Sequence, residues 1–272
     1  MRTRIVSSIL CLAFVLAAAP VQAQYGVRGQ SNRATGENYR FEFGLYFWNP
    51  TPDLVIQTEW RGIVGDEIDI VEDLQIEKTR FTQIRAVLRP AKKHKFRFER
   101  TPIKYEQPEG VLERDIIFNG QRYSLALPVD TTIDWKAYRF SYEYDLIYRD
   151  RGFLGIILEA KYTDVQATLS NVLTTEFVRA RAPIPAVGAI GRVYVAPNIS
   201  VTAEFSGFKI PESFDEDYGG KYFDFDLYGT VNFSDKFGAQ AGYRSFDVFY
   251  KAETDEGTLK IKGPYLGGVV RF

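Results

Sequence analysis

The sequence offers few candidate catalytic residues, because it holds a single histidine, His94. His94 lies in the basic run Lys92-Lys93-His94-Lys95, which has the composition of a solvated turn. A histidine that activates a nucleophile or a water needs a Ser or Asp partner beside it. We therefore interpret His94 as a turn residue and expect no histidine-dependent site.

Paired carboxylates are the second candidate for acid–base chemistry. Asp224 and Asp226, like Glu143 and Asp145, stand two positions apart in segments with strand-like alternation. Two such carboxylates point to the same face of a strand and are able to serve as acid and base. Opposing Arg side chains are the more usual partners of such pairs, so we predict that the protein is not an enzyme.

Charged side chains at alternate positions form the largest set of candidate functional residues, and we expect them to face the interior of a barrel. The cations are Arg40, Arg85, Arg89, Lys95, Arg97, Arg139, Lys161, Arg192, Arg244 and Arg271, and the anions are Glu42, Glu99, Glu143, Asp145, Glu159, Glu204, Asp224 and Asp226. The near balance favours a lumen bridged shut by Arg–carboxylate pairs, since buried charges must be paired or hydrated. The alternative is a narrow or gated polar passage lined by the same residues, although a selective pore more naturally carries one sign of charge.

The elements that must position these charges are long strands. Between Trp135 and Tyr148, for example, aromatic and polar residues alternate with period two over a stretch far longer than an average strand. Working back from the C-terminus, the alternation predicts ten strands, at 257–272, 236–252, 220–233, 198–210, 182–196, 152–168, 133–148, 94–106, 79–89 and 38–49. Short and long connections alternate between them, with the long ones at 50–78, 106–132, 169–181, 210–219 and 253–257. This layout is typical of an all-β, transmembrane, antiparallel up-and-down β-barrel.

Two segments leave the strand count open. Residues 116–123 have the pattern of a hairpin with an Asn119-Gly120 turn, and residues 54–60 have that of a short strand. We expect both to lie in loops outside the cell. If both crossed the membrane instead, the barrel would have twelve strands.

The N-terminus predicts export. Arg2 and Arg4 precede an apolar run that ends at a small-residue cleavage motif, Val21-Gln22-Ala23. Residues 1–23 are therefore predicted to be a signal peptide cleaved after Ala23, followed by a short periplasmic tail at 24–37 and a barrel domain at 38–272. The only Cys and the only Met fall within the predicted signal peptide, so the mature chain would hold no disulfide.

The chain ends in Phe272, preceded at alternate positions by Val270, Gly268 and Leu266. With the signal peptide and the strand layout, this ending resembles the C-terminal signature of bacterial outer-membrane β-barrel proteins. The resemblance implies a place in the outer membrane and recognition of Leu266, Val270 and Phe272 by the barrel-assembly machinery. Outer-membrane phospholipases, lipid A deacylases, palmitoyl transferases and omptin-type proteases share this architecture, but each of these families uses a catalytic His near the outer rim.

The predicted outer loops are acidic, and aromatic residues lie near the ends of the predicted strands. Acidic stretches at 65–73, 215–217 and 255–256 are interpreted as a solvated rim rather than a divalent-cation site. Aromatic residues near strand ends are expected to form interfacial girdles, namely Trp48, Trp135, Tyr148, Phe153 and Phe233. We expect a monomer without cofactor or nucleic-acid partner, surrounded by outer-membrane lipids and lipopolysaccharide. Its role is predicted to be structural or surface interaction through the outer loops, and the alternative is a small pore for polar or amphipathic solutes.

Overall fold

A computed structural model of the chain describes residues 33–272 except 61–62, 126, 211–217 and 253–254. The predicted signal peptide and most of the predicted tail lie outside the described residues. The described part is built from β-strands, and it contains no helix that is long and apolar enough to cross a membrane.

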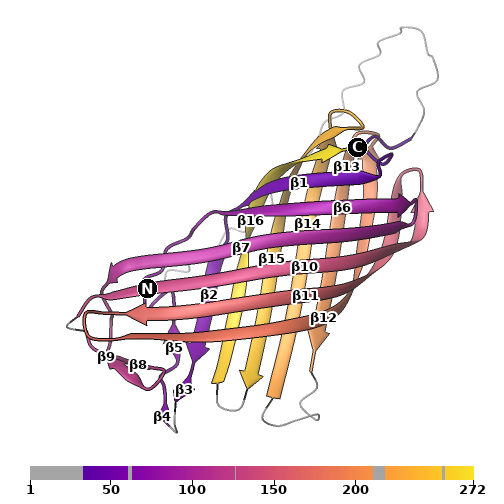
Figure 1. Ribbon diagram of the computed structural model, residues 1–272. Helices are drawn as coiled ribbons and strands as arrows, with labels where there is room; N and C mark the ends of the chain where they lie inside the picture. Colours follow the sequence, from indigo (N-terminus) through magenta and orange to yellow (C-terminus); the bar gives the residue numbers. More distant parts are fainter. Residues whose placement is uncertain (1–32, 61–62, 126, 211–217, 253–254) are drawn as a thin grey trace, which may run out of the picture. The chain divides into compact units, whose positions relative to one another are not determined.

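Ten long strands form a closed antiparallel barrel (Figure 1). Neighbouring strands follow one another along the chain, and β1 pairs with β16 to close the ring through the register Glu42↔Arg271. The predicted all-β, ten-stranded up-and-down barrel is thus confirmed. Its strands are β1 (Phe41–Trp48), β6 (Phe81–Ala91), β7 (His94–Gly110), β10 (Val129–Arg149), β11 (Gly152–Ser170), β12 (Thr175–Ala196), β13 (Ile199–Lys209), β14 (Tyr218–Asn232), β15 (Phe237–Ala252) and β16 (Asp255–Arg271).

Of the two segments that left the strand count open, the hairpin stays outside the main sheet, whereas part of residues 54–60, expected in a loop, joins the sheet as β2 without adding a strand to the closed ring. The hairpin of β8 (Ile116–Phe118) and β9 (Gln121–Tyr123) pairs only with itself among the described residues, and so does that of β3 (Glu59–Trp60) and β4 (Ile63–Val64). β2 (Thr51–Gln57) continues the pairing of β1 along the outer half of β16, and β5 (Ile68–Asp69) pairs with β2. The twelve-stranded alternative is therefore wrong.

The distribution of apolar and charged side chains is the reverse of that in a water-soluble protein. Large apolar residues such as Phe43, Leu158 and Phe225 are exposed on the outer surface, whereas charged residues fill the interior. Alternation explains this arrangement, because successive residues of a strand point to opposite faces and each strand carries both sets. An apolar outer wall around a polar interior is the arrangement of a barrel that faces lipid.

The barrel is one continuous ring only in the half that carries the short turns, which we call the turn end. In the other half, the loop end, the wall divides into two sheets, one of β7, β10, β11 and β12 and one of β13, β14, β15, β16, β2 and β5. The last described pairs across the divisions are Val187↔Gly207 between β12 and β13 and Ile84↔Arg100 between β6 and β7. In Figure 1 the first sheet runs to the left, while β14, β15 and β16 run downwards.

This division corrects one predicted connection. Residues 169–181 were expected to form a long loop, but β11 and β12 stay paired up to Ser170↔Thr175. The outer half of β12 is therefore a strand that has a partner only on its β11 side among the described residues.

The loop end is covered by the two longest loops. The β8–β9 hairpin turns at Asn119 and Gly120, whose φ angles of 49° and 75° fit a type I′ turn. It is anchored on one side by Asn119 N–H donating to Thr58 Oγ1 at 3.0 Å and on the other by Tyr123 O–H donating to the Leu169 carbonyl at 2.9 Å. Ile116 and Phe118 of the hairpin and Ile68 of β5 are buried. The described parts of residues 58–78 and 111–128 are thus held together at the loop end, and we call them the cap.

Candidate functional site

The interior of the continuous ring is filled by charged side chains. Among the described residues, nine buried cations face nine buried carboxylates. The cations are Arg85, Arg89, Lys95, Arg97, Arg139, Lys161, Arg192, Arg244 and Arg271, and the carboxylates are Glu37, Glu42, Glu99, Glu143, Asp145, Glu159, Glu204, Asp224 and Asp226. The equal numbers matter, because an unpaired charge in a low-dielectric interior is strongly destabilising.

Shared ion pairs join opposite walls of this interior. Glu99 on β7 receives Arg85 at 3.0 Å and also contacts Arg244 on β15. Arg244 in turn contacts Asp224 at 2.9 Å, and Asp224 contacts Lys161 at 3.1 Å. The chain of contacts therefore runs from β7 across β15 and β14 to β11. We call the whole set of eighteen charges the lumen network.

A second group of pairs lies nearer the turn end. Glu143 receives Lys95 at 2.5 Å and Arg97, while Arg97 reaches across to Glu204 at 2.6 Å. Glu42 and Arg271, which are register partners at the β1–β16 seam, are 2.5 Å apart. Each of these charges has a counter-charge, so the lumen network forms a bridged plug.

The described part of the N-terminal segment closes the turn end. Ala34 and Thr35 donate backbone hydrogen bonds to the carbonyls of Asp150 and Pro197, and Gly36 N–H donates to Asp235 Oδ1 at 2.8 Å. Gly36 has a φ of 85°, a left-handed conformation that suits glycine. The segment thus binds three different turns.

Glu37 carries this segment into the lumen network. Its carboxylate accepts hydrogen bonds from Arg192 Nη1 and the Tyr194 hydroxyl, both at 2.8 Å, and from Arg89 at 3.3 Å. Burial by itself would raise the pKa of Glu37, but the positive charges of Arg192 and Lys95 hold it below its usual value. Glu37 therefore supplies the ninth negative charge.

An aromatic layer separates the lumen network from the loop end. It consists of Trp48, Trp135, Tyr222 and Phe246, with ring centroids of Trp48 and Phe246 5.3 Å apart. The Arg244 guanidinium lies 4.2 Å from the Phe246 ring centroid, and the Lys161 ammonium lies 4.0 Å from that of Tyr222. One side of the layer thus makes cation–π contacts with the network.

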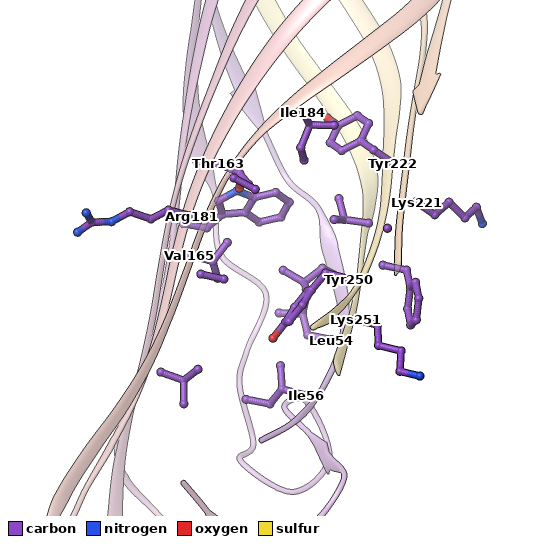
Figure 2. A pocket seen from close by; sticks show the side chains of 18 of the residues that line it. Leu54, Ile56, Thr163, Val165, Arg181, Ile184, Lys221, Tyr222, Tyr250 and Lys251 are labelled. Atoms are coloured by element: carbon purple, nitrogen blue, oxygen red, sulfur yellow. The ribbon is translucent and has the colours of Figure 1, made fainter. Parts of the chain in front are cut away.

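On the other side of the aromatic layer lies a cavity of about 470 Å³, which we call the chamber (Figure 2). Leu54, Ile56 and Tyr250 point into it, whereas Arg181 and Lys221 point away. From β12 its lining includes the small or apolar residues Val178, Ala180, Ala182 and Ile184, together with Arg179, Arg181 and Pro183. Its size falls within the usual range of small-molecule sites, about 300–1,000 Å³.

The predicted lumen residues lie inside the barrel with one exception. Arg40 is exposed, so its placement in the lumen was wrong. The reason is that β1 begins only at Phe41, and Arg40 sits in the bend before it, where strand alternation does not yet apply. Glu37 was missed in turn, because it precedes the first alternating segment and carries no periodic signal.

Three of the predicted girdle residues are also corrected. Trp48, Trp135 and Phe153 are buried inside the barrel and do not face the outer surface. For Trp48 the parity of the strand gave the signal, because it shares the face of Glu42. Phe233 is exposed, as expected for an outer position.

His94 and the acidic loops offer no catalytic or metal centre. His94 is half-buried, and its Nδ1 lies 2.7 Å from the Tyr142 hydroxyl, so it is a partnered residue at the turn end rather than a solvated one. No group of three His, Cys, Asp or Glu side chains that could hold a metal occurs in the described part of the chain. Residues 215–217 lie outside that part. Asp66, Asp69 and Asp73 accept hydrogen bonds from nearby N–H groups instead.

Comparison with known proteins identifies the fold. No protein-family profile and no curated protein matches the chain. Among solved structures, the outer-membrane protease OmpT from Escherichia coli is similar with a TM-score of 0.58 at 6% identity, over 85% of this chain and 96% of that one. Ail of Yersinia pestis covers 86% of this chain and 99% of its own at 11% identity with a TM-score of 0.39. A Pseudomonas aeruginosa FadL homologue covers 86% and 90% at 7% identity with a TM-score of 0.39. The fold is that of an outer-membrane β-barrel.

Proposed function

We propose that the protein spans the outer membrane as a barrel that is closed to solutes along its axis. It serves a structural or surface-interaction role through its loop end and is neither an open pore nor an enzyme. The exposed apolar wall supports the membrane placement, because exposed Phe and Leu side chains encircle the barrel. The short turns would then face the periplasm and the cap the outside of the cell.

The lumen network is the observation that carries this proposal. A conducting pore needs a continuous hydrated path, yet here the charges from opposite walls touch one another. Arg85, for example, contacts Glu99 at 3.0 Å and Asp226 at 3.2 Å. The described N-terminal segment covers one end of the network and the aromatic layer the other. Among the described residues, the loop end is therefore the surface to which we assign the function.

The cap is the part that would meet an external partner or lipopolysaccharide. Its loops carry exposed charges such as Glu67, Glu72 and Arg114. Leu266 and Phe272 are exposed on the outer wall, where a C-terminal assembly signal would be accessible; with Val270, they remain the proposed recognition signal for the barrel-assembly machinery.

Liposome swelling tests the closed axis. The refolded mature protein, its folded state verified by heat-modifiable gel migration, is incorporated into liposomes and diluted into isotonic arabinose, with a general porin as positive control. We expect no swelling above that of empty liposomes. Swelling that scales with the amount of folded protein would support the alternative, a small pore, and overturn the proposal.

A further inference from the structure

The chamber extends to the gap in the barrel wall. Its lining includes Arg179 to Ile184 of β12 on one side and Phe208, Ile210 and Gly220 on the other. These two edges belong to the two sheets that separate beyond Val187↔Gly207. The chamber therefore reaches the gap between β12 and the β13–β14 hairpin.

Two prolines keep this gap from closing. Pro183 and Pro185 stand at alternate positions of β12, so both missing N–H groups fall on the same side of the strand. The β11 side stays in continuous register through them, with Pro183 opposite Tyr162 and Pro185 opposite Ala160. A proline fits a ladder only where its nitrogen faces away from the paired strand. The edge at the gap therefore lacks two donors that β13 would need for pairing.

The gap crosses the level at which the outer wall changes from apolar to charged. Val187 and Phe223 are exposed near its inner end. Further toward the loop end, the outward side chains of β12 include Arg181 and Arg179, with the exposed ring of Phe177 beyond them. On the wall of a membrane protein, this change marks the boundary between hydrocarbon and headgroups.

Among the described residues, cations outnumber carboxylates by two to one at each lip of the gap. Arg179 and Arg181 share one carboxylate, Asp164, at 2.5 Å and 3.5 Å, so this cluster keeps one net positive charge. Across the gap, Lys209 and Lys221 are exposed register partners, and Lys221 is 3.3 Å from Asp247. Unlike the balanced lumen network, these lips are suited to an anion.

We propose that the chamber binds the hydrocarbon chain of an anionic amphiphile, which slides in from the membrane between β12 and β13 while Arg179 and Arg181 hold its headgroup. The walls explain the chain, because aliphatic side chains offer a hydrocarbon dispersion contacts and few hydrogen bonds. The cations at the lips of the gap explain why the headgroup would be anionic. This inference rests on the proposed membrane placement but not on the closed axis, so binding and conduction can fail independently.

Quenching of Trp135 by bromine tests the proposal. Trp135 is buried and lines the chamber, so a brominated chain inside it would quench the indole on contact. The refolded protein in detergent is titrated with brominated palmitate, and the Trp135→Phe variant gives the background from the other tryptophans. We expect saturable quenching that Trp135→Phe removes.

Matched variants separate the chamber from the outer wall. Ala182 lines the chamber and Val187 faces outward on the same strand, so Ala182→Phe fills the site while Val187→Phe adds the same ring to the outer surface. Ala182→Phe should weaken binding at least about tenfold, equivalent to about 1.4 kcal/mol, and Val187→Phe should leave it unchanged. Heat-modifiable migration of both variants verifies that each is folded.

A separate pair of variants tests whether Arg179 and Arg181 bind the anionic headgroup. Arg179→Ala with Arg181→Ala should weaken binding of brominated palmitate roughly threefold, as expected for exposed charges, and leave its methyl ester unaffected. Vesicles of brominated phosphatidylglycerol distinguish the sources: quenching there, absent in Ala182→Phe, indicates a membrane lipid, and quenching by palmitate alone indicates a free fatty acid. Absence of saturable quenching in both arms, or equal effects of Ala182→Phe and Val187→Phe, would overturn the proposal.

Discussion

Glu37 accepts a hydrogen bond from Arg192 at 2.8 Å, although the two residues are 155 positions apart in the chain. The contact joins the segment before β1 to the turn end of β12 and brings the buried carboxylates to nine. A segment predicted to be a periplasmic tail is, in its described part, a component of the plug.

Glu37→Gln tests that role. Without the ninth carboxylate, Arg192 and Arg89 keep their buried charges with less compensation. We expect a loss of about 3–5 kcal/mol in the free energy of unfolding, the usual cost of breaking a buried ion pair. Urea unfolding of the refolded protein, followed by tryptophan fluorescence, measures it. Glu113→Gln, at an exposed loop position, is the control and should change little.

Acid should weaken the same contact. The pKa of Glu37 is held below its usual value in the folded protein by Arg192 and Lys95, despite burial. Its contribution to stability is therefore complete above the pKa of the unfolded chain, about 4.3, and is lost as the pH falls through the lower folded value. Between about pH 7 and pH 3, the wild type should lose more stability than Glu37→Gln. Equal losses in the two proteins would show that Glu37 titrates normally.

The seam of the barrel offers a double-mutant cycle. Glu42 and Arg271 are buried register partners 2.5 Å apart on β1 and β16. Glu42→Ala and Arg271→Ala should each cost about 3–5 kcal/mol, because each leaves the opposite charge buried without its partner. The double variant should cost clearly less than the sum. Additive losses in urea unfolding would mean that the pair is not coupled.

The cap depends on its hairpin turn. Gly120 has a φ of 75°, which a β-branched residue adopts only with strain, so Gly120→Val should loosen the β8–β9 hairpin. We expect faster cleavage within residues 106–132 by protease added to intact cells, with unchanged heat-modifiable migration. Gly229→Val, near the turn end of β14 where φ is not positive, is a comparison that should not expose the cap. Protection of the loop in Gly120→Val cells would contradict either the anchoring of the cap or its position outside the cell.

The periodic part of the fold could be predicted from sequence because strand alternation and barrel closure follow the same two-residue rule. Once a strand is recognised, the facing of residues such as Arg97 and Glu204 follows from parity. The rule fails at element boundaries, which explains the error at Arg40 and the omission of Glu37. The same two-residue rule predicts that Trp48 is buried, because Trp48 and Glu42 are an even number of positions apart on β1.

The chamber and the gap could not be predicted from strand alternation. They arise where the outer halves of the consecutive strands β12 and β13 diverge, and two-residue alternation does not show where neighbouring strands stop pairing. Pro183 and Pro185 were the available signal, because two prolines at alternate positions mark a strand edge that cannot pair. Their meaning becomes clear only when the register shows which edge is unpaired.

The most direct test of the closed axis is single-channel recording of the refolded mature protein in a planar bilayer. The lumen network predicts no stable unitary steps from protein whose folded state is established by heat-modifiable migration. Reproducible steps, with an ion selectivity that changes in Asp226→Ala, would contradict the account and make the lumen charges the lining of a pore.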